Sequence, residues 1–444
     1  MLKRFKIGGI HPNDNKLSKT AAIEVLPLAQ KVVIPLSQHI GAPAKAIVKK
    51  GDTVKVGDMI AEAGGFVSAA VHSSVSGVVE KVDAITDNMG LSKMAVIIKV
   101  DGDEWNEAID RSPELKKECN LPKDEIIKKI AAAGIVGMGG ATFPTQVKLS
   151  PPPGKTATAL VINGVECEPY LTSDHRVMLE KSAEIMVGID ILCKAIGVKK
   201  AYVGIENNKP DAIKIMTAAA KEYSFVEVVP LRVQYPQGGE KQLIDAVMNR
   251  QVPSGALPIE VGAVVQNIGT ALAVYEAVQK DKPLFERVVT VTGKSVKTPK
   301  NFLTRVGTPI SQLIEAAGGL PENVSKVING GPMMGRSCSN IEAPVTKGCS
   351  GILMMNDEES VRKEPKSCIR CAKCVSVCPM GLEPYLLATL SNRNMFAEQE
   401  EHRVTDCIEC GSCSFTCPAT LPLLDVIRLG KGEVMKIIRS RSAR

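Results

Sequence analysis

Aromatic residues are scarce in this chain of 444 residues: Phe, Trp and Tyr together make up 3% of the sequence, and Trp105 is the single tryptophan. So few rings cannot build a platform on which successive nucleotide bases stack. The net charge of +7 therefore does not indicate a nucleic-acid-binding protein, and we expect no nucleic acid among the partners.

Long apolar runs are also missing. No stretch approaches the roughly 20 continuous apolar residues of a membrane-spanning helix, so we expect a protein that is soluble by itself and meets a membrane only through partners. The chain has no H-E-x-x-H, G-x-S-x-G or other hydrolytic pattern, so no residue is predicted to be a catalytic acid, base or nucleophile. Its length and its 44% of hydrophobic residues allow about three domains with buried cores.

Cysteine, in contrast, is abundant and patterned. Eight of the 13 cysteines form two copies of the spacing C-x2-C-x2-C-x3-C-P: Cys368, Cys371, Cys374 and Cys378 before Pro379, then Cys407, Cys410, Cys413 and Cys417 before Pro418. This spacing is typical of chains that wrap thiolates around cubane iron–sulfur clusters, and two copies predict two [4Fe-4S] clusters. The protein is therefore predicted to carry electrons.

In two-cluster ferredoxins the fourth cysteine of each run binds the cluster of the other run. We therefore expect one cluster on Cys368, Cys371, Cys374 and Cys417, and the other on Cys407, Cys410, Cys413 and Cys378. Zinc is the weaker alternative, because zinc sites use two C-x2-C pairs without a third cysteine. Disulfides are weaker still, since the cysteine count is odd and no secretory signal is recognised at Met1.

The two runs are expected to lie in an α-helical ferredoxin module over residues 358–430, because leucines recur at helical spacing from Leu382 to Leu390 and again after the second run. A basic tail follows over residues 431–444. Its cations are Lys431, Lys436, Arg439, Arg441 and Arg444, against Glu433 alone. A solvated tail, and docking of the tail on an acidic partner or on anionic lipid headgroups, both stay open.

Residues 1–110 are predicted to form a barrel-sandwich hybrid, because short apolar segments alternate with glycine turns. The phrase Lys50–Asp58 resembles biotinyl and lipoyl carrier domains. Those domains carry a modifiable lysine at a hairpin tip, whereas this chain has Phe66–His72 there, without a lysine. We therefore predict a structural or interface domain, in which His72 is a surface histidine or a hydrogen-bonded one and not a metal ligand.

The middle of the chain, residues 120–284, alternates strand and helix patterns, which predicts a Rossmann-like α/β domain with a mainly parallel sheet. Strands are expected at 160–162, 201–205 and 225–229, with helices at 178–196 and 211–222. A polar linker over 103–122 precedes this domain, and a β-grasp unit over 285–350 follows it. The predicted fold class is thus a multidomain α/β chain.

The central domain contains a glycine-rich loop, Gly134–Thr145. Glycines at positions 137, 139 and 140 remove side chains, so the backbone can approach a phosphate or a ring, and Lys148 adds a positive charge nearby. The loop is neither a Rossmann fingerprint nor a Walker A loop. Further along the chain come the segments 163–169, 235–242 and 265–270.

In order and spacing these segments resemble the 51-kDa flavin- and NADH-binding subunit of respiratory complex I, whose loop reads Gly-Arg-Gly-Gly-Ala-Gly-Phe-Pro-Thr. By this resemblance, FMN and NAD(H) are expected on Gly137, Gly139, Gly140, Lys148, Asn163, Glu166, Glu168, Gly239, Glu240, Gln266, Asn267 and Thr270, with Glu168 on the NADH side. Three positions depart from that family: Met138 replaces the loop arginine, Val165 an acidic residue and Lys241 a glutamate.

The whole chain is more similar to the RnfC family, the flavin- and cluster-bearing subunits of the Rnf complexes, which are membrane-bound ferredoxin:NAD+ oxidoreductases that couple electron flow to ion transport. Residues 5–16, 204–210 and 330–335 look like signatures of that family. The predicted domains also occur in the order of that family, in which the β-grasp unit is called SLBB.

This resemblance implies hydride exchange between NAD(H) and FMN, followed by single-electron steps through the two clusters, because a flavin accepts two electrons together and releases them singly. The implied partners are other Rnf-type subunits, including membrane-embedded ones and a ferredoxin-like iron–sulfur subunit, at the cytoplasmic face of the cell membrane. Two alternatives stay open. One is a cobalamin reductase with the same flavin, β-grasp and cluster parts; the other is a non-catalytic electron wire or assembly module, which Met138, Val165 and Lys241 favour.

Overall fold

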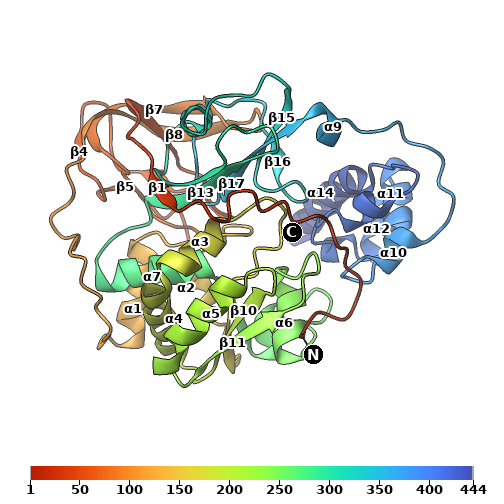
Figure 1. The fold of residues 1–444 in the computed structure, drawn as a ribbon, viewed down its shortest axis with the longest axis horizontal. Helices are drawn as coiled ribbons and strands as arrows, with labels where there is room; N and C mark the ends of the chain where they lie inside the picture. The colour runs from red at the N-terminus through yellow and green to blue at the C-terminus, as the bar shows by residue number, and fades with distance from the viewer. Residues whose placement is uncertain (1, 443–444) are drawn as a thin grey trace.

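The computed structural model describes residues 2–442; Met1, Ala443 and Arg444, the last cation of the predicted tail, lie outside the described residues. Figure 1 shows the β-rich first and third units above the central unit, with the helical C-terminal module to one side, beyond an extended segment that follows α9 (Asp357–Ser360). The N-terminal segment lies along this module, where the backbone N–H of Gly9 donates to the carbonyl of Val377 at 2.9 Å.

The first unit consists of two antiparallel sheets around one core of valine and isoleucine side chains, among them Val32, Ile34 and Ile60. The strands of the larger sheet are β2 (Lys31–Pro35), β8 (Ser92–Gly102), β7 (Ser76–Thr86) and β4 (Thr53–Val54), and those of the smaller sheet are β3 (Lys45–Ala46), β5 (Met59–Glu62) and β6 (Val71–His72). The expectation of uniformly short strands was wrong for β7 and β8, which pair over 11 residues each.

The central unit has a four-stranded, all-parallel sheet in the order β11-β10-β9-β12. Its strands are β9 (Ala159–Asn163), β10 (Ala201–Glu206), β11 (Val226–Leu231) and β12 (Ala263–Asn267). Alternate side chains face opposite layers: Leu160 and Ile162 pack into the core of the larger helical layer, while Val161 packs against the α6 side. The parallel sheet is as the sequence predicts.

The helices around this sheet are α1 (Lys123–Ala132), α2 (Thr145–Lys148), α3 (Ser173–Glu180), α4 (Ser182–Ile196), α5 (Pro210–Ala219), α6 (Glu240–Met248) and α7 (Ile268–Gln279). The single helix expected at 178–196 is two helices, because Lys181 leaves helical geometry at φ −133° and ψ 27°. Gly197 ends α4 in the left-handed region at φ +73°. Strand β12 and helix α7 were not predicted.

The third unit is a six-stranded sheet in the order β1-β14-β13-β17-β15-β16, packed against α8 (Ile310–Ala316). Its strands are β1 (Ile23–Val25), β13 (Glu286–Thr292), β14 (Lys300–Arg305), β15 (Val324–Asn329), β16 (Arg336–Ser337) and β17 (Gly351–Asn356). The sheet extends beyond the range 285–350 at both ends, since β1 comes from the N-terminal segment and β17 follows residue 350.

The C-terminal module is helical. Its helices are α10 (Lys373–Ser376), α11 (Pro384–Asn392), α12 (Phe396–Glu401), α13 (Ser412–Thr416) and α14 (Leu423–Ser442). Residues 431–442 continue α14 instead of forming a solvated tail: Val434 is fully buried, and Arg441 pairs with Glu400 at 2.9 Å. Among the described residues, no helix combines the length and the apolarity that crossing a membrane requires.

Close packing of α4 on α7 gives a testable stability prediction. A Cβ added at Gly188 would lie 1.9 Å from the carbonyl oxygen of Ala271, so Gly188→Ala should lower the free energy of unfolding by about 1–3 kcal/mol. The matched control is Gly432→Ala, where nothing lies within 4 Å and alanine should raise helix stability by about 0.5–1 kcal/mol. Thermal unfolding checks both, and equal midpoints for the two variants would contradict the packing.

Candidate functional site

The two cysteine runs adopt the same backbone shape. In each run, the residue before the second cysteine is left-handed: Arg370 has φ 55° and Glu409 has φ 57°. The residue after the second cysteine is left-handed as well, at φ 56° for Ala372 and 78° for Gly411. Alanine and arginine rarely adopt this geometry, so a turn repeated twice in this form indicates a loop shaped around a bound group.

The thiols approach one another across the two runs. The Cys378 thiol interacts electrostatically with Cys410, and Cys413 with Cys407, Cys410 and Cys378. The partner of Cys374 is Cys417. These electrostatic interactions place Cys378 near the second run and Cys417 near the first, and the two ligand sets stay a prediction. We call Cys378, Cys407, Cys410 and Cys413 the inner set, and Cys368, Cys371, Cys374 and Cys417 the outer set.

The surroundings of the thiols fit a bound cluster. Burial, with a smaller contribution from neighbouring thiols, raises the pKa of Cys413 to about 12; burial also raises the pKa of Cys407 to about 11, although the Glu409 N–H and Lys431 oppose this shift. Such thiols become thiolates when a metal replaces their protons. The backbone N–H of Leu382 donates to the Cys378 sulfur at 3.4 Å, a contact that tunes cluster thiolates. Within residues 2–442, no three Cys, His, Asp or Glu side chains converge as closely as a single metal ion requires.

The two sets differ in exposure. In the outer set Cys368 and Cys371 are exposed, whereas all of the inner set is buried or half-buried. The inner set meets the central unit: the Tyr235 hydroxyl donates to the Cys410 carbonyl at 2.8 Å, and Cys410, Tyr235 and Ile10 form one apolar contact. The inner set therefore lies on the side of the central unit, and the outer set lies at the surface.

Glu168 lies at this junction. Its carboxylate accepts the backbone N–H groups of Met333 at 3.1 Å and Met334 at 2.8 Å, in the loop 330–335 of the third unit. The Tyr235 hydroxyl is 3.4 Å from the same carboxylate. Burial raises the pKa of Glu168 to about 7. The residue expected on the NADH side thus uses its oxygens for a contact between the central and third units, beside the tyrosine that contacts the cluster module.

The glycine-rich loop lies at the end of the parallel sheet. The Gly137 N–H donates to the Phe143 carbonyl at 2.8 Å, and the Met138 N–H donates to the Thr270 hydroxyl at 2.9 Å, so both ends of the loop are fixed. Gly139 is left-handed at φ +101°, and a Cβ there would come within 2.8 Å of the Asn267 amide. Gly140 faces open space. The loop therefore leaves its backbone bare at the position where a ligand is predicted.

Several predicted cofactor residues hold the site together. The Glu166 carboxylate accepts the N–H of Asp174 at 2.7 Å and caps α3. Asn267 caps α7 by accepting the Gly269 N–H at 2.7 Å, and donates to the Asp174 carboxylate at 2.7 Å. The Asn163 amide donates to the Gly238 carbonyl at 2.9 Å, beside Gly239. These three residues position the loops in the structure by hydrogen bonds to backbone and side chains.

Lys148 and Glu240 form an ion pair of 2.7 Å, and Lys148 also donates to the Val265 carbonyl at 3.1 Å. The three positions that depart from the complex I family have different surroundings. Met138 and Val165 are buried, and Lys241, on the solvent side, donates to the Pro253 carbonyl at 3.1 Å.

Buried polar atoms without partners show that this region fits a ligand. Gln266 is 2% exposed, and its Nε2 has no hydrogen-bond partner; Gln237 is fully buried, and neither of its amide atoms has one. The buried Thr145 hydroxyl is also unpaired. Leaving such hydrogen bonds unmade costs free energy, which hydrogen bonds to a polar ring system would recover. The sequence did not single out Gln237 and Thr145 as site residues, although both lie in the segments that contain the predicted ones.

Comparison with known proteins reveals matches along the whole chain. Four family models match in succession: the RnfC barrel sandwich hybrid domain over residues 3–103, the Nuo51 FMN-binding domain over 130–276, the SLBB domain over 288–337 and a 4Fe-4S dicluster domain over 360–418.

Full-length relatives agree. The chain is 47% identical over 439 residues to a subunit of the proton-translocating ferredoxin:NAD(+) oxidoreductase complex of Clostridium ljungdahlii, covering 98% of this chain and 94% of that protein. It is 45% identical to a subunit of the Na(+)-translocating ferredoxin:NAD(+) oxidoreductase complex of Acetobacterium woodii, covering 96% of each. Identity to a subunit of the ion-translocating oxidoreductase complex of Rhodobacter capsulatus is 43%, over 98% of this chain and 84% of that one.

This chain belongs to the RnfC family. The predicted fold class is confirmed, from the barrel-sandwich hybrid to the dicluster domain. The predicted cofactor classes are confirmed as well, since the family carries an FMN-binding domain and a domain for two [4Fe-4S] clusters.

A buried lysine joins three units behind the glycine-rich loop. Lys347 is 1% exposed, and its ammonium donates to the carbonyls of Ala70 and Gly134, both at 2.8 Å. Ala70 belongs to the hairpin tip that carries a lysine in carrier domains, and Ala69 beside it is buried in the core of the FMN-binding domain. The tip is therefore an interface, as predicted, and Lys347 fixes it to the start of the glycine-rich loop.

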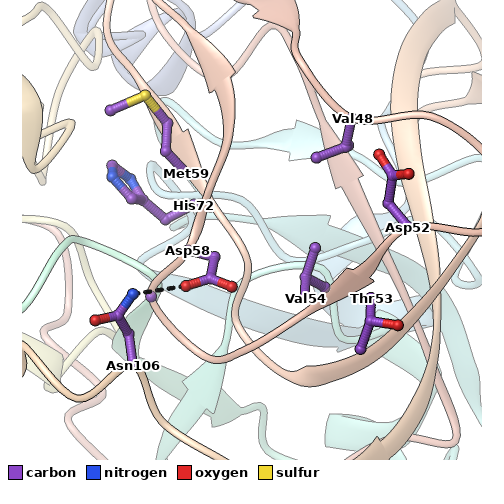
Figure 2. Close-up of a pocket in the computed structure, with 9 residues that line it drawn as sticks. Val48, Asp52, Thr53, Val54, Asp58, Met59, His72 and Asn106 are labelled. Carbon is purple, nitrogen blue, oxygen red and sulfur yellow. Dashed lines mark hydrogen bonds between the residues drawn. The ribbon is translucent and has the colours of Figure 1, made fainter.

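His72, at the end of this hairpin, is not a surface residue. It is 4% exposed, its Nδ1 has no hydrogen-bond partner, and burial lowers its pKa to about 3. The expectation of a surface histidine was therefore wrong, whereas the alternative of a hydrogen-bonded ring holds in part, because the ring has one hydrogen bond, to the Ala132 backbone. Figure 2 shows His72 beside a cavity of about 580 Å³ within the barrel-sandwich hybrid, where the Asn106 amide donates to Asp58 at 2.7 Å.

The ligand sets predict how iron is lost. Cys378→Ala and Cys407→Ala should each remove the same inner cluster, so the single variants and their double variant should all retain about four irons per chain. The control pair Cys374→Ala with Cys378→Ala comes from one run but from two sets, and should retain almost none. Iron and sulfide analysis after anaerobic reconstitution checks this, and four irons in the control pair would contradict the crossed ligation.

Lys347 predicts a pH dependence of stability. Burial lowers its folded-state pKa from the ordinary 10.5 to about 7, so between these pH values the unfolded chain holds a proton that the folded protein has lost. Stability from this group therefore rises as pH rises from 7 to 10. Relative to Lys347→Met, the unfolding midpoint of the unmodified protein should increase by about 2 °C or more over this range. Relative to the exposed control variant Lys199→Met, the difference in unfolding midpoint should stay constant over this pH range. A constant difference relative to Lys347→Met as well would contradict the lowered pKa of Lys347.

Proposed function

We propose that this chain is the electron-transfer subunit of an ion-translocating ferredoxin:NAD+ oxidoreductase, in which electrons pass between NAD(H) and a partner subunit. The observation that supports this proposal best is the junction between the FMN-binding domain and the inner cysteine set, made by Tyr235 and Cys410 at 2.8 Å. A nicotinamide exchanges two electrons as a hydride and a cubane cluster exchanges one, so a protein with both sites needs an FMN in between, which supplies this conversion when bound.

The residues have separate tasks in this proposal. The bare backbone of Gly137, Gly139 and Gly140 lets the loop approach FMN closely, and the buried amides of Gln237 and Gln266 supply hydrogen bonds that the protein leaves unmade. Glu166, Asn163 and Asn267 hold the loops in place. Lys148, which is predicted to lie near the FMN phosphate, already pairs with Glu240. Its positive charge is therefore neutralised by a carboxylate of the protein.

The order of the two clusters follows from the exposure of their ligands. The inner set faces the FMN-binding domain, and the outer set, with Cys368 and Cys371 exposed, faces solvent. We therefore assign exchange with the flavin domain to the inner set and exchange with a partner subunit to the outer set. The same arrangement of sites serves electron flow from NADH and electron flow toward NAD+.

The partners in this proposal are the other subunits of the complex, including membrane-embedded ones that carry the ion path. The chain would lie against them as a peripheral subunit at the cytoplasmic face. The relatives in Clostridium ljungdahlii and Acetobacterium woodii are subunits of proton- and Na(+)-translocating complexes, respectively, and membership in a complex of several subunits is common to both.

The flavin site has a direct test. Gly139→Asp places a side chain and a negative charge on the bare loop, so the reconstituted variant should keep about eight irons per chain and lose FMN binding and reduction by NADH at least about a hundredfold. The control is Gly154→Asp, also left-handed, at φ +81°, with nothing within 4 Å. Fluorescence of released flavin and NADH-dependent bleaching report the result. Unchanged flavin content in Gly139→Asp would rule out this loop as the FMN site.

A further inference from the structure

The two cysteine runs are an internal repeat, and corresponding faces of the two copies have different surroundings. Because both runs share their spacing and their left-handed positions, Ile369 corresponds to Ile408, Arg370 to Glu409 and Lys373 to Ser412. Any difference in burial between these pairs therefore reflects what covers each copy, and not the local backbone.

The face of the second copy is covered by the rest of the chain. Ile408 packs with Tyr235 and Ile10, and Ser412 is fully buried. Glu409 is surrounded by cations: Arg428 at 2.9 Å, Lys431 at 3.2 Å and Arg336 of the third unit at 3.5 Å. Arg428 and Lys431 belong to α14 of the same module, so the contact with neighbouring units consists of Ile408 packed on Tyr235 and Ile10 and of the ion pair between Glu409 and Arg336.

The same face of the first copy is bare. Residues 361–373 are all exposed, and Ile369 has 68% of its surface in solvent. Phe415, two residues before the outer ligand Cys417, is 56% exposed. An isoleucine and a phenylalanine next to an exposed cluster loop are large apolar groups that a partner would cover.

The charge of this face is positive. Residues 361–373 contain Arg362, Lys363, Lys366, Arg370 and Lys373 against Glu364 alone. Arg362 pairs with Asp425, whereas the side chains of the other four cations have no ion-pair partner among the residues that the structure describes. Arg370 stands where the covered copy has the acid Glu409, so the sign of the docking charge is reversed.

We propose that residues 361–373, with Phe415, are the docking surface for an acidic iron–sulfur protein that exchanges single electrons with the outer cluster. In the covered copy, the docking contact consists of an apolar residue, Ile408, and of a charged residue, Glu409, which pairs with the oppositely charged Arg336 of a neighbouring unit. Since the bare copy presents cations around its cluster loop, the partner must present carboxylates around its own. This inference rests on the proposed function, because it assumes that the outer set holds a cluster.

A protein partner is favoured over an anionic membrane by the position of the cations. Arg370 lies between the ligands Cys368 and Cys371, so an anion that pairs with it is brought next to the cluster itself. Steering of this kind raises the rate at which oppositely charged proteins associate, and the rate falls as salt screens the charges.

The test uses the full chain with both clusters and FMN reconstituted. A pre-reduced acidic 2[4Fe-4S] ferredoxin is mixed with the oxidised protein in a stopped-flow instrument at low and high ionic strength. The variant Lys363→Glu with Lys366→Glu changes two cations that lie outside the cluster loop. We expect its second-order rate of electron uptake to fall about tenfold or more at low salt, with the difference shrinking at high salt. The variant Arg370→Gln should lower the same rate.

The matched control is Lys199→Glu with Lys214→Glu, two exposed lysines of the FMN-binding domain, which alters the net charge equally. Its rate should equal that of the unmodified protein. Bleaching of flavin and clusters by NADH, measured on the same samples, should be unchanged in the Lys363 and Lys366 variant, which separates the docking surface from the proposed function. Failure of NADH bleaching in the unmodified protein would instead count against the proposed function.

Four results would overturn the docking proposal. The first two concern the unmodified protein: electron uptake that is absent, or uptake that does not depend on salt. The third is an equal loss of rate in the variant and its control. The fourth is salt-dependent binding to phosphatidylglycerol vesicles that the Lys363 and Lys366 variant loses while its rate with ferredoxin stays normal. That outcome would assign the surface to a membrane.

Discussion

The contact between Tyr235 and the Cys410 carbonyl is the constraint on which the rest of the arrangement depends. Electron exchange between a flavin domain and a cluster domain requires the two to keep a fixed separation, and here a single hydrogen bond at the cluster loop is reinforced from two sides. Glu168 ties the loop 330–335 to the same tyrosine, and the N-terminal segment binds Tyr235 through Ile10 and the cluster module through Gly9. Three units thus converge on one loop of the inner set.

The barrel-sandwich hybrid is fixed to the flavin domain by a separate contact, which Lys347 makes. Its hairpin tip lacks the lysine of carrier domains, and a lysine from elsewhere in the chain, Lys347, reaches the tip from the other side. Because this ammonium has no carboxylate partner and bonds two carbonyls, it holds Ala70 and Gly134 together at the cost of burying a charge. The start of the glycine-rich loop is therefore held against the hairpin tip of the barrel-sandwich hybrid.

The sequence predicted those features that depend on local pattern. Cysteine spacing is a local pattern, so the sequence alone predicts both ligand sets; the apolar runs of β9, β10 and β11 likewise predict the parallel sheet that the structure contains. Tertiary contacts left no such signal. Nothing local indicates that Ile23–Val25 pairs with β14 almost 280 residues later, or that the Glu168 carboxylate turns toward Met333 and Met334. Residues 431–442 likewise join the module through contacts outside their own segment, such as the ion pair between Arg441 and Glu400. The assignment of FMN and NAD(H) to single residues stays a prediction.

In the proposed electron path, the inner set lies between the flavin domain and the outer set. This order can be tested by following the two clusters separately by electron paramagnetic resonance after rapid mixing with NADH, in a protein whose inner cluster is removed by Cys407→Ala and in one whose outer cluster is removed by Cys371→Ala. We expect that the inner cluster is still reduced quickly when the outer one is missing, and that the outer cluster stays oxidised on the same timescale when the inner one is missing. An outer cluster that NADH reduces equally fast without its neighbour would contradict this order.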